Sequence, residues 1–466
     1  MKNSTEIFES APVPLAVAKM AVPTVASMLV SVVYNMVDTF FVGQLGDANQ
    51  VAAVSIATPV FLFLMAAGNV FGVGGSSFIS RTLGEKKPEK IKNISSLCFY
   101  GGLAASIVGM LIFLLGTKGI LGLVGASEAT YPYAAKYLEY IAYGAPTVVL
   151  SVAFTNLLRG EGAATVSMVS MMSGTVTNII LDPVFILPSI FGIPMLDMGV
   201  TGAAVATVIG NVVTLAICLW HALGKNSLLS IHPRYFTVRH RIALSTVSIG
   251  IPASVNNVLM SLSNIVMNIF LKNCDGGGDN AIAGMGVAMK ANMLVVFLQF
   301  GVAMGTQPLI GYNFGAKNFA RMKHIMRFAM LCTLLIGSLM TGLYIIFSHS
   351  IIRRFVPGAY DVIDLGCRML NALMMSGPFL GILFMFSFTF QAMGKALPSL
   401  ALAVSRQGFV FLPMLFIGRA VAGLYGVIYA QPVADIISIL MALCMFLYMN
   451  KGFRRAEQSA PPSANS

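Results

Sequence analysis

Long apolar runs recur along the whole chain, and they constrain its fold more than any other feature. A run of about 20 residues can cross the hydrocarbon core of a bilayer as a helix. Apolar residues make up 57% of the 466 residues and charged residues only 10%, whereas a soluble domain carries about 25% charged residues. The sequence therefore predicts an all-α membrane protein with twelve transmembrane helices, near 15–43, 53–80, 95–117, 137–158, 165–187, 199–221, 242–271, 282–311, 326–347, 370–391, 397–417 and 424–449.

The basic residues predict how these helices are oriented. With the N-terminus in the cytoplasm, most of the 29 lysines and arginines fall in segments on the cytoplasmic side, as the positive-inside rule requires. Both termini of this multi-pass protein are therefore expected in the cytoplasm. The net charge of +12 follows from this topology, so nucleic-acid binding is not expected. Residues 1–14 lack the basic region of a cleavable signal, which argues against one.

The two halves of the chain repeat each other. Six helices return the chain to its starting side, so the repeats are parallel and related by a pseudo-twofold axis along the membrane normal. The expected units are a cytoplasmic segment 1–14, a first lobe 15–221, a cytoplasmic linker 222–241, a second lobe 242–449 and a cytoplasmic tail 450–466. The residues that match at offsets of 224 to 232 positions include Pro23 with Pro252, Gly84 with Gly315, Gly162 with Gly394 and Gly199 with Gly423.

Two acidic residues of the first lobe indicate a cation site. Asp38 and Asp182 each lie five residues inside the outer end of an apolar run, where a carboxylate costs about 2.5 to 3.5 kcal/mol. An asparagine precedes each acid by about one turn, Asn35 before Asp38 and Asn178 before Asp182. If the two helices adjoin, the acids share one site. A proton or a sodium ion would then relieve the repulsion between two desolvated carboxylates.

A structural role stays open as the alternative for each acid. Asp38 would then hydrogen-bond to a neighbouring helix. Pro183 would bend its helix and free a backbone carbonyl group, and Asp182 would cap the freed backbone. A static scaffold, however, would need no carboxylates within the membrane.

Three ionisable residues lie well inside the apolar runs of the second lobe: Lys290, Arg406 and Asp435. Arg406 and Asp435 lie near mid-membrane on consecutive helices, where a buried ion pair would satisfy both charges. The alternative is that Lys290 or Arg406 contacts an anionic or zwitterionic substrate, because a basic residue that faces the cleft would repel cationic compounds. Both interpretations stay open at this point.

The sequence has no pattern typical of an enzyme or a metal site. The six cysteines are scattered without ligand spacing, and the five histidines fall at or beyond the ends of apolar runs. No nucleophile motif or phosphate loop is recognisable. We therefore expect a protein that is not an enzyme and needs no cofactor, with H⁺ or Na⁺ as its coupling ion.

The sequence resembles the multidrug and toxic compound extrusion (MATE) family along essentially its whole length. It is most similar to the DinF-like branch and its MepA-type relatives, because Met267 stands opposite Asp38 in the repeat and the second lobe lacks paired acids. The stretches that carry the resemblance are Asn35 to Asp38, GEG at 160–162, Asn178 to Pro183 and GVTGAAVAT at 199–207.

The resemblance implies two pseudo-symmetric six-helix lobes of the MATE/MOP-type fold in the bacterial inner membrane. It implies a multidrug efflux antiporter that exports amphipathic, usually cationic, drug-like compounds in exchange for H⁺ or Na⁺ by alternating access. A monomer is expected, although the sequence does not fix the oligomeric state. The family positions carried over place the coupling cation at Asp38, Asn178 and Asp182. Thr207 and Tyr137 are further candidates, with Asn35 and Pro183 in support.

Two other functions are weighed against this one. A flippase or exporter of lipid-linked precursors or metabolites, from the same superfamily, would want a basic cavity, which Lys290 and Arg406 offer. Such flippases commonly have additional helices, which are not expected here. A channel or receptor fits less well, because the lobes are duplicated and no ligand-binding domain is appended.

Overall fold

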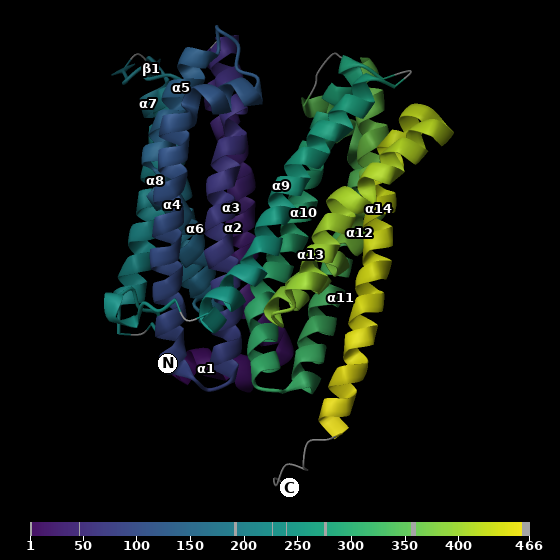
Figure 1. Cartoon of the computed structure of the whole chain (residues 1–466). Helices are drawn as coiled ribbons and strands as arrows, with labels where there is room; N and C mark the ends of the chain where they lie inside the picture. Colours follow the sequence, from purple (N-terminus) through teal and green to yellow (C-terminus); the bar gives the residue numbers. More distant parts are fainter. Residues whose placement is uncertain are drawn as a thin grey trace.

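The structure is a computed structural model that describes residues 2–45, 47–190, 193–225, 227–238, 240–274, 277–355 and 360–458. Helices make up nearly all of it (Figure 1). The first half contains α1 (Lys2–Glu9), α2 (Val13–Gly43), α3 (Ala48–Gly84), α4 (Pro88–Val124), α5 (Tyr131–Tyr143), α6 (Ala145–Gly160), α7 (Ala164–Ile186), the short hairpin β1 (Ser189–Ile190) and β2 (Ile193–Pro194), and α8 (Val200–Leu223). The second half contains a 3-10 turn (Pro233–Tyr235), α9 (His240–Lys272), α10 (Asp279–Gly315), α11 (Phe319–Phe355), α12 (Tyr360–Ala392), α13 (Ala396–Val404), a π-helical turn (Ser405–Phe409) and α14 (Phe411–Gln458).

The predicted transmembrane helices are present, with one difference in how they are built. Within the described residues, ten helical runs are long and apolar enough to cross a membrane, and α5 with α6 adds another span that is bent by 55°. The last run, Ala396–Lys451, holds two predicted helices, because its backbone leaves the helical conformation at Gly423, with φ 57° and ψ −130°. A Cβ on Gly426 would lie 1.8 Å from the Gly418 carbonyl oxygen, so the chain turns back on itself there.

The backbone of the second half repeats the special turns of the first. Residues with positive φ recur at the offsets found in the sequence, although such a conformation is uncommon for a residue other than glycine. The same local turns therefore occur in both lobes, which agrees with the predicted pseudo-symmetry. The pairs are Lys86 (57°) with Lys317 (60°), Gly162 (97°) with Gly394 (74°), and Gly199 (56°) with Gly423 (57°).

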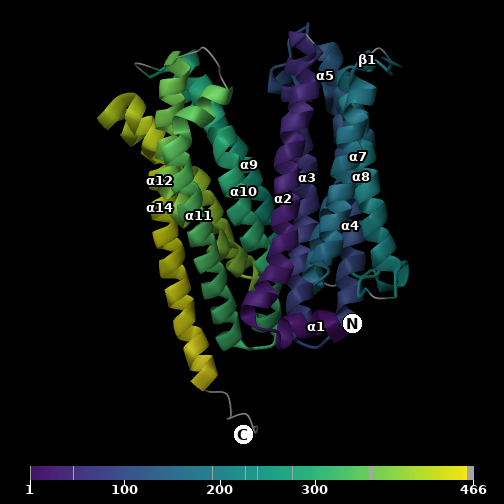
Figure 2. The ribbon, with the colours of Figure 1, turned by 180° about the vertical axis from the view of Figure 1, so that it is seen from behind.

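Helices α2 to α8 form one lobe and α9 to α14 form the other (Figure 1). The lobes lie close together at the end that carries α1, here called the α1 face, and they diverge toward the end that carries α5 and β1, here called the β1 face. Figure 2 shows the same divergence from behind. Between the lobes, α3 packs against α9 and α2 packs against α10.

Small residues let the two lobes touch near the α1 face. A Cβ on Gly74 would lie 2.0 Å from the carbonyl oxygen of Thr246, and one on Gly301 would lie 2.9 Å from the Cα of Val25. The Ser254 hydroxyl group donates a hydrogen bond of 2.6 Å to the Ala66 carbonyl oxygen across the same interface. Side chains larger than hydrogen at Gly74 or Gly301 would force the helices apart.

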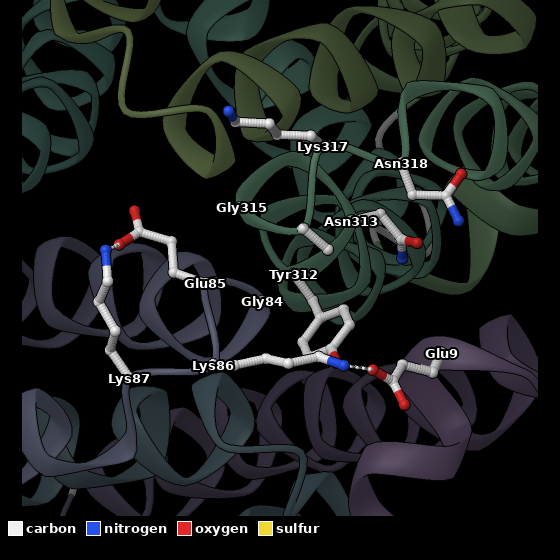
Figure 3. A pocket seen from close by; sticks show the side chains of 11 residues that line it. Glu9, Gly84, Glu85, Lys86, Lys87, Tyr312, Asn313, Gly315, Lys317 and Asn318 are labelled. Carbon is white, nitrogen blue, oxygen red and sulfur yellow. Dashed lines mark hydrogen bonds and ion pairs between the residues drawn. The ribbon is translucent and has the colours of Figure 1, made fainter. Parts of the chain in front are cut away.

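At the α1 face itself, the ends of α3 and α10 cross on the pseudo-twofold axis. A Cβ on Gly84 would lie 2.0 Å from the Tyr312 carbonyl oxygen, and one on Gly315 would lie 2.1 Å from that of Arg81. These two contacts are equivalent, because Gly84 corresponds to Gly315 and Arg81 to Tyr312 in the repeat. A cavity of about 520 Å³ opens beside this crossing (Figure 3).

The first helix precedes the first lobe in the sequence but is docked on the second lobe. The Phe8 ring is fully buried and stacks on Tyr312, with ring centroids 5.0 Å apart. Tyr312 donates a hydrogen bond of 2.9 Å to the Glu9 carboxylate, which also pairs with Lys86 at 3.4 Å (Figure 3). Arg321 of α11 donates to the Phe8 and Ala11 carbonyl oxygens. Residues 1–14, predicted only as a cytoplasmic segment, therefore include a helix that connects the lobes.

The segment between the lobes is fastened to the first lobe. Ser95 and Ser96 of α4 both donate hydrogen bonds to the Ser230 carbonyl oxygen. The buried Glu161 carboxylate accepts hydrogen bonds from the Ser227 hydroxyl and the Leu228 amide groups, each at 2.9 Å. The GEG stretch thus holds the connection in place rather than forming part of the acidic site.

Candidate functional site

The acidic site begins with a close approach of α7 and α8. A Cβ on Gly174 of α7 would lie 2.4 Å from the Gly210 carbonyl oxygen, and one on Gly210 would lie 2.7 Å from that of Gly174. The two helices can therefore pack backbone to backbone. One turn further along α7, this contact brings Asn178 against Thr207 of α8, and the Asn178 amide group lies 3.5 Å from the Thr207 hydroxyl oxygen.

Asp182 and Asn178 lie one turn apart on the buried face of α7. Asp182 is fully buried and Asn178 is 3% exposed. Neither oxygen of Asp182 has a hydrogen-bond partner among the described residues, and the side-chain oxygen of Asn178 has none either. Buried polar atoms are nearly always hydrogen-bonded in native proteins. Three unpaired oxygen atoms in one place therefore indicate a site for a ligand that offers them a positive charge or a proton.

Asp38 reaches this site from α2, which packs along α7. The Asp38 side chain is half-buried, and its charge lies close enough to Asp182 for the two carboxylates to interact electrostatically. The helices that carry Asp38 and Asp182 therefore adjoin, as a shared site for the two acids requires. Both acids lie near the end of their helix at the β1 face, α2 ending at Gly43 and α7 at Ile186.

Two tyrosines complete the surroundings of the acids. Tyr137 of α5 lies within electrostatic range of both Asp38 and Asp182. Tyr34 of α2 lies in range of the same two acids, and its hydroxyl group is 3.5 Å from the Thr207 hydroxyl oxygen. Sequence reasoning missed Tyr34. Its signal was its position one turn before Asp38, the same spacing that singled out Asn178 before Asp182.

The two supporting residues, Asn35 and Pro183, differ in how they relate to the site. Asn35 is exposed, and its amide group donates a hydrogen bond of 2.7 Å to the Ser31 carbonyl oxygen of its own helix. It is therefore not among the residues that the structure brings together. Pro183 lies inside α7, which continues to Ile186. Asp182 does not cap the backbone there, because its oxygens have no partner among the described residues.

The arrangement suits a proton or a small cation bound by oxygen atoms. A carboxylate accepts hydrogen bonds only, whereas a protonated carboxyl group also donates one. A proton on Asp182 could thus be donated to the side-chain oxygen of Asn178. A sodium ion could instead be bound by oxygens of Asp38, Asp182, Asn178 and Thr207. The described residues contain no group of three or more His, Cys, Asp and Glu side chains that could hold a metal ion.

Arg406 and Asp435 form a buried pair in the second lobe. The Arg406 guanidinium group donates to Asp435 at 2.8 Å, and the exposed fractions of the two side chains are 13% and 3%. Gln431 and Ser376 also donate to the Asp435 carboxylate, each at 2.9 Å. Arg406 lies in the π-helical turn, and its guanidinium carbon lies 5.3 Å from the centre of the Phe384 ring. Both charges are therefore satisfied inside the lobe.

Lys290 is not part of this cluster. It is exposed on α10 and has no hydrogen-bond or ion-pair partner in the part of the chain that the structure describes. The structure thus separates the three ionisable residues of the second lobe into a satisfied pair and one free ammonium group.

Comparisons with known proteins match both lobes. The MatE family model matches residues 23–184 and 252–417, one stretch in each half. The chain is similar to a protein named multidrug export protein MepA from Staphylococcus saprophyticus, with 32% identity over 436 residues and 94% of each chain covered. A MepA protein from Staphylococcus aureus is 31% identical, again with 94% of each chain covered.

Solved structures share the fold. One, described as MATE in complex with MaL6, has a TM-score of 0.90 and 24% identity, and the match covers 98% of this chain and 100% of that chain. Another is described as the outward-facing conformation of a multidrug resistance MATE family transporter of the MOP superfamily. It has a TM-score of 0.88 and 25% identity, with 97% of this chain and 98% of that chain covered.

Proposed function

This chain belongs to the multidrug and toxic compound extrusion (MATE) family, and we propose that it is a secondary antiporter that exports amphipathic drug-like compounds in exchange for H⁺ or Na⁺. Members of this family are transporters rather than enzymes. The proposed activity is therefore movement of a substrate and a cation in opposite directions across the bilayer, coupled through one protein.

The unpaired oxygens of the acidic site carry this proposal. Asp182 and Asn178 present three buried oxygen atoms without a partner among the described residues, next to the second carboxylate of Asp38. Two carboxylates this close in a low-dielectric environment repel each other, and binding of a cation removes that repulsion. The site should therefore be occupied by a proton or a sodium ion for part of the transport cycle.

Helix α2 connects this site to the interface between the lobes. Asp38 lies on its second half, whereas Val25 lies on its first half against Gly301 of α10. A cation that draws Asp38 toward α7 would thus alter the part of α2 that contacts the second lobe. A ligand can shift a conformational equilibrium only by its difference in affinity for the two states, and α2 provides a route for such a difference.

Access to the site follows from the shape of the two lobes. The lobes diverge toward the β1 face (Figures 1 and 2), and the positive-inside rule assigns the α1 face to the cytoplasm. In this conformation the acidic site would exchange cations with the outside. Alternating access would require a second conformation in which the contacts at the α1 face separate.

Purified protein in proteoliposomes, with proton and sodium gradients imposed independently, tests the coupling. Asp38→Asn keeps the size and most of the hydrogen bonding of the side chain but removes its charge, so we expect the protein to fold and gradient-driven export to be lost. Asp182→Asn should have the same effect. The double variant should be little worse than either single one, because residues that act as a unit are not additive.

Asp364→Asn is the matched control. Asp364 lies on α12, its side chain is 65% exposed, and it forms a surface ion pair with Arg368. Its neutralisation should therefore leave export unchanged. Near-normal gradient-driven export by a well-folded Asp38→Asn protein would show that the first lobe does not hold the coupling site. Export that responds to neither gradient in the unmodified protein would refute antiport.

A further inference from the structure

Lys290 faces the other lobe rather than the lipid. An α-helix turns 100° per residue, so residues 11 positions apart lie within about 20° of each other around the helix. Lys290 lies 11 positions before Gly301, which touches Val25 of α2 in the first lobe. The core of the second lobe lies on the opposite side of α10, where Ala281, Ala288 and Val295 are buried.

The repeat supports this assignment independently. Pro59 of α3 corresponds to Lys290, and Val70 corresponds to Gly301. Val70 likewise touches the other lobe, since a Cβ on Gly250 of α9 would lie 1.9 Å from its carbonyl oxygen. The pseudo-symmetric positions on α3 and α10 therefore both face the space between the lobes, and only the second lobe places a charge there.

The level of Lys290 can be read from the antiparallel packing of α2 and α10. Eleven residues span about 16 Å along a helix, so Lys290 lies this far from Gly301 toward the β1 face. The corresponding step along α2 leads from Val25 to Met36, whose side chain is 47% exposed. Lys290 and Met36 thus face each other where the lobes have diverged, at nearly the depth of Asp38.

Lys290 is the isolated charge at this depth. Between the inter-lobe contacts and the β1 face, the charged residues of α2, α3, α9 and α10 are Asp38, Lys272, Asp279 and Lys290. Asp38 interacts electrostatically with Asp182 of α7, and Lys272 and Asp279 lie at helix ends. An unpaired charge within a membrane-spanning segment costs about 2.5 to 3.5 kcal/mol or more in lipid. The ammonium group is therefore stable only if water or an anion occupies the space before it.

We propose that Lys290 recognises the anionic group of substrates in the space between the lobes, and that the exported compounds include amphipathic molecules that carry a carboxylate. The carboxylate pairs with the ammonium group, and the apolar body of the compound packs against exposed apolar side chains such as Met36 and Phe40. This inference rests on the proposed export function and specifies one of its substrate classes.

The test uses twin compounds that share one amphipathic body and differ in one group, a carboxylate or its uncharged primary amide. Export of both is measured in proteoliposomes for the unmodified protein, Lys290→Gln, Lys290→Arg and the control Lys272→Gln. Lys272 is exposed at the end of α9. Its replacement by glutamine changes the net charge by the same amount as Lys290→Gln. An equilibrium binding measurement on the purified protein, without a gradient, accompanies the export assay.

We expect Lys290→Gln to weaken binding of the carboxylate twin about tenfold or more, as loss of a charge-assisted hydrogen bond predicts. Binding and export of the amide twin should remain, which also shows that the variant folds. Lys290→Arg should retain most of the preference, and Lys272→Gln should not alter it. Equal loss for both twins, or no loss for either, would overturn the proposal.

Failure of the export function and failure of recognition by Lys290 give different results. If the unmodified protein exports neither twin, the proposed export of such compounds fails. If it exports both and Lys290→Gln leaves their ratio unchanged, only the recognition by Lys290 fails. The measurements are repeated in vesicles of zwitterionic lipid and in vesicles that contain anionic lipid. A Lys290 effect confined to binding of anionic lipid, with the twin preference unchanged, would also overturn the proposal.

Discussion

Replacing Phe8 with alanine should release α1 and open the α1 face. The Phe8 ring is fully buried and stacked on Tyr312 of the second lobe, so its removal loses contacts between the lobes. Truncation of a buried phenylalanine costs about 3 to 5 kcal/mol. That cost applies only to the conformation in which α1 is docked, so the equilibrium should shift toward conformations in which the lobes separate at the α1 face.

The size of the shift follows from the same value. A change of about 1.4 kcal/mol corresponds to a factor of ten in an equilibrium constant, so about 3 kcal/mol predicts an increase of more than 100-fold in the open population. Ser80 reports this opening, because it is fully buried at the α1 face, where its hydroxyl oxygen would lie 2.2 Å from a Cβ on Gly311. The rate at which a thiol reagent labels Ser80→Cys, in a background without other cysteines, measures the population.

Phe8→Ala should therefore speed labelling of Ser80→Cys about 100-fold in the purified protein. Glu6→Ala is the control, because Glu6 is an exposed residue of the same helix and should leave the rate unchanged. An unchanged labelling rate in a folded Phe8→Ala protein would refute the idea that α1 holds the lobes together.

Two more predictions follow from the described contacts. The hydrogen bond from Tyr312 and, to a smaller extent, the charge of Lys86 hold the pKa of Glu9 below its ordinary value of 4.5. The ionised Glu9 therefore stabilises the docked α1. This stabilisation is fully present above pH 4.5 and is lost as the pH falls through the lower pKa of the folded state. Because the reactive thiolate becomes scarcer in acid, labelling of Ser80→Cys is compared with that of an exposed reference thiol at the same pH. This relative rate should increase over that acidic range, and Glu9→Gln should remove the increase. Arg406→Gln or Asp435→Asn should each lower the free energy of unfolding by about 3 to 5 kcal/mol, because each leaves one buried charge unpaired. The double variant should recover part of this loss. No recovery would contradict a structural pair.

The span pattern could be predicted because it depends on local composition. A helix that crosses the bilayer needs about 20 apolar residues, whatever it packs against. The bend inside the span of α5 and α6 was not predicted, whereas the turn at Gly423 falls between the predicted helices 397–417 and 424–449. The bend at Gly144 depends on a neighbouring helix, because a Cβ on Gly144 would lie 2.3 Å from Val208 of α8.

The acidic site was predictable in part for a similar reason. The depths of Asp38 and Asp182 are set by helix geometry, so the sequence could place them at one level. Which side chains turn toward them depends on packing. Asn35 lies on the same helix as Asp38 but bonds to its own backbone, whereas Tyr34 reaches Thr207 of another helix. The docking of α1 was likewise invisible, because Phe8 stacks on Tyr312 and its carbonyl oxygen accepts a hydrogen bond from Asn313, both about 300 positions away.

The crossing of Gly84 and Gly315 has a consequence for how such a chain could arise. Gly84 contacts Tyr312, and Gly315 contacts Arg81, which is the equivalent of Tyr312 in the repeat. The contact is therefore self-complementary, as in a twofold homodimer. A single six-helix lobe could close against a second copy of itself through this same surface. Once two copies are joined in one chain, the paired positions are free to diverge. Tyr312 then binds the first helix, whereas its equivalent Arg81 lies against Gly394, and one closure contact acquires two different functions.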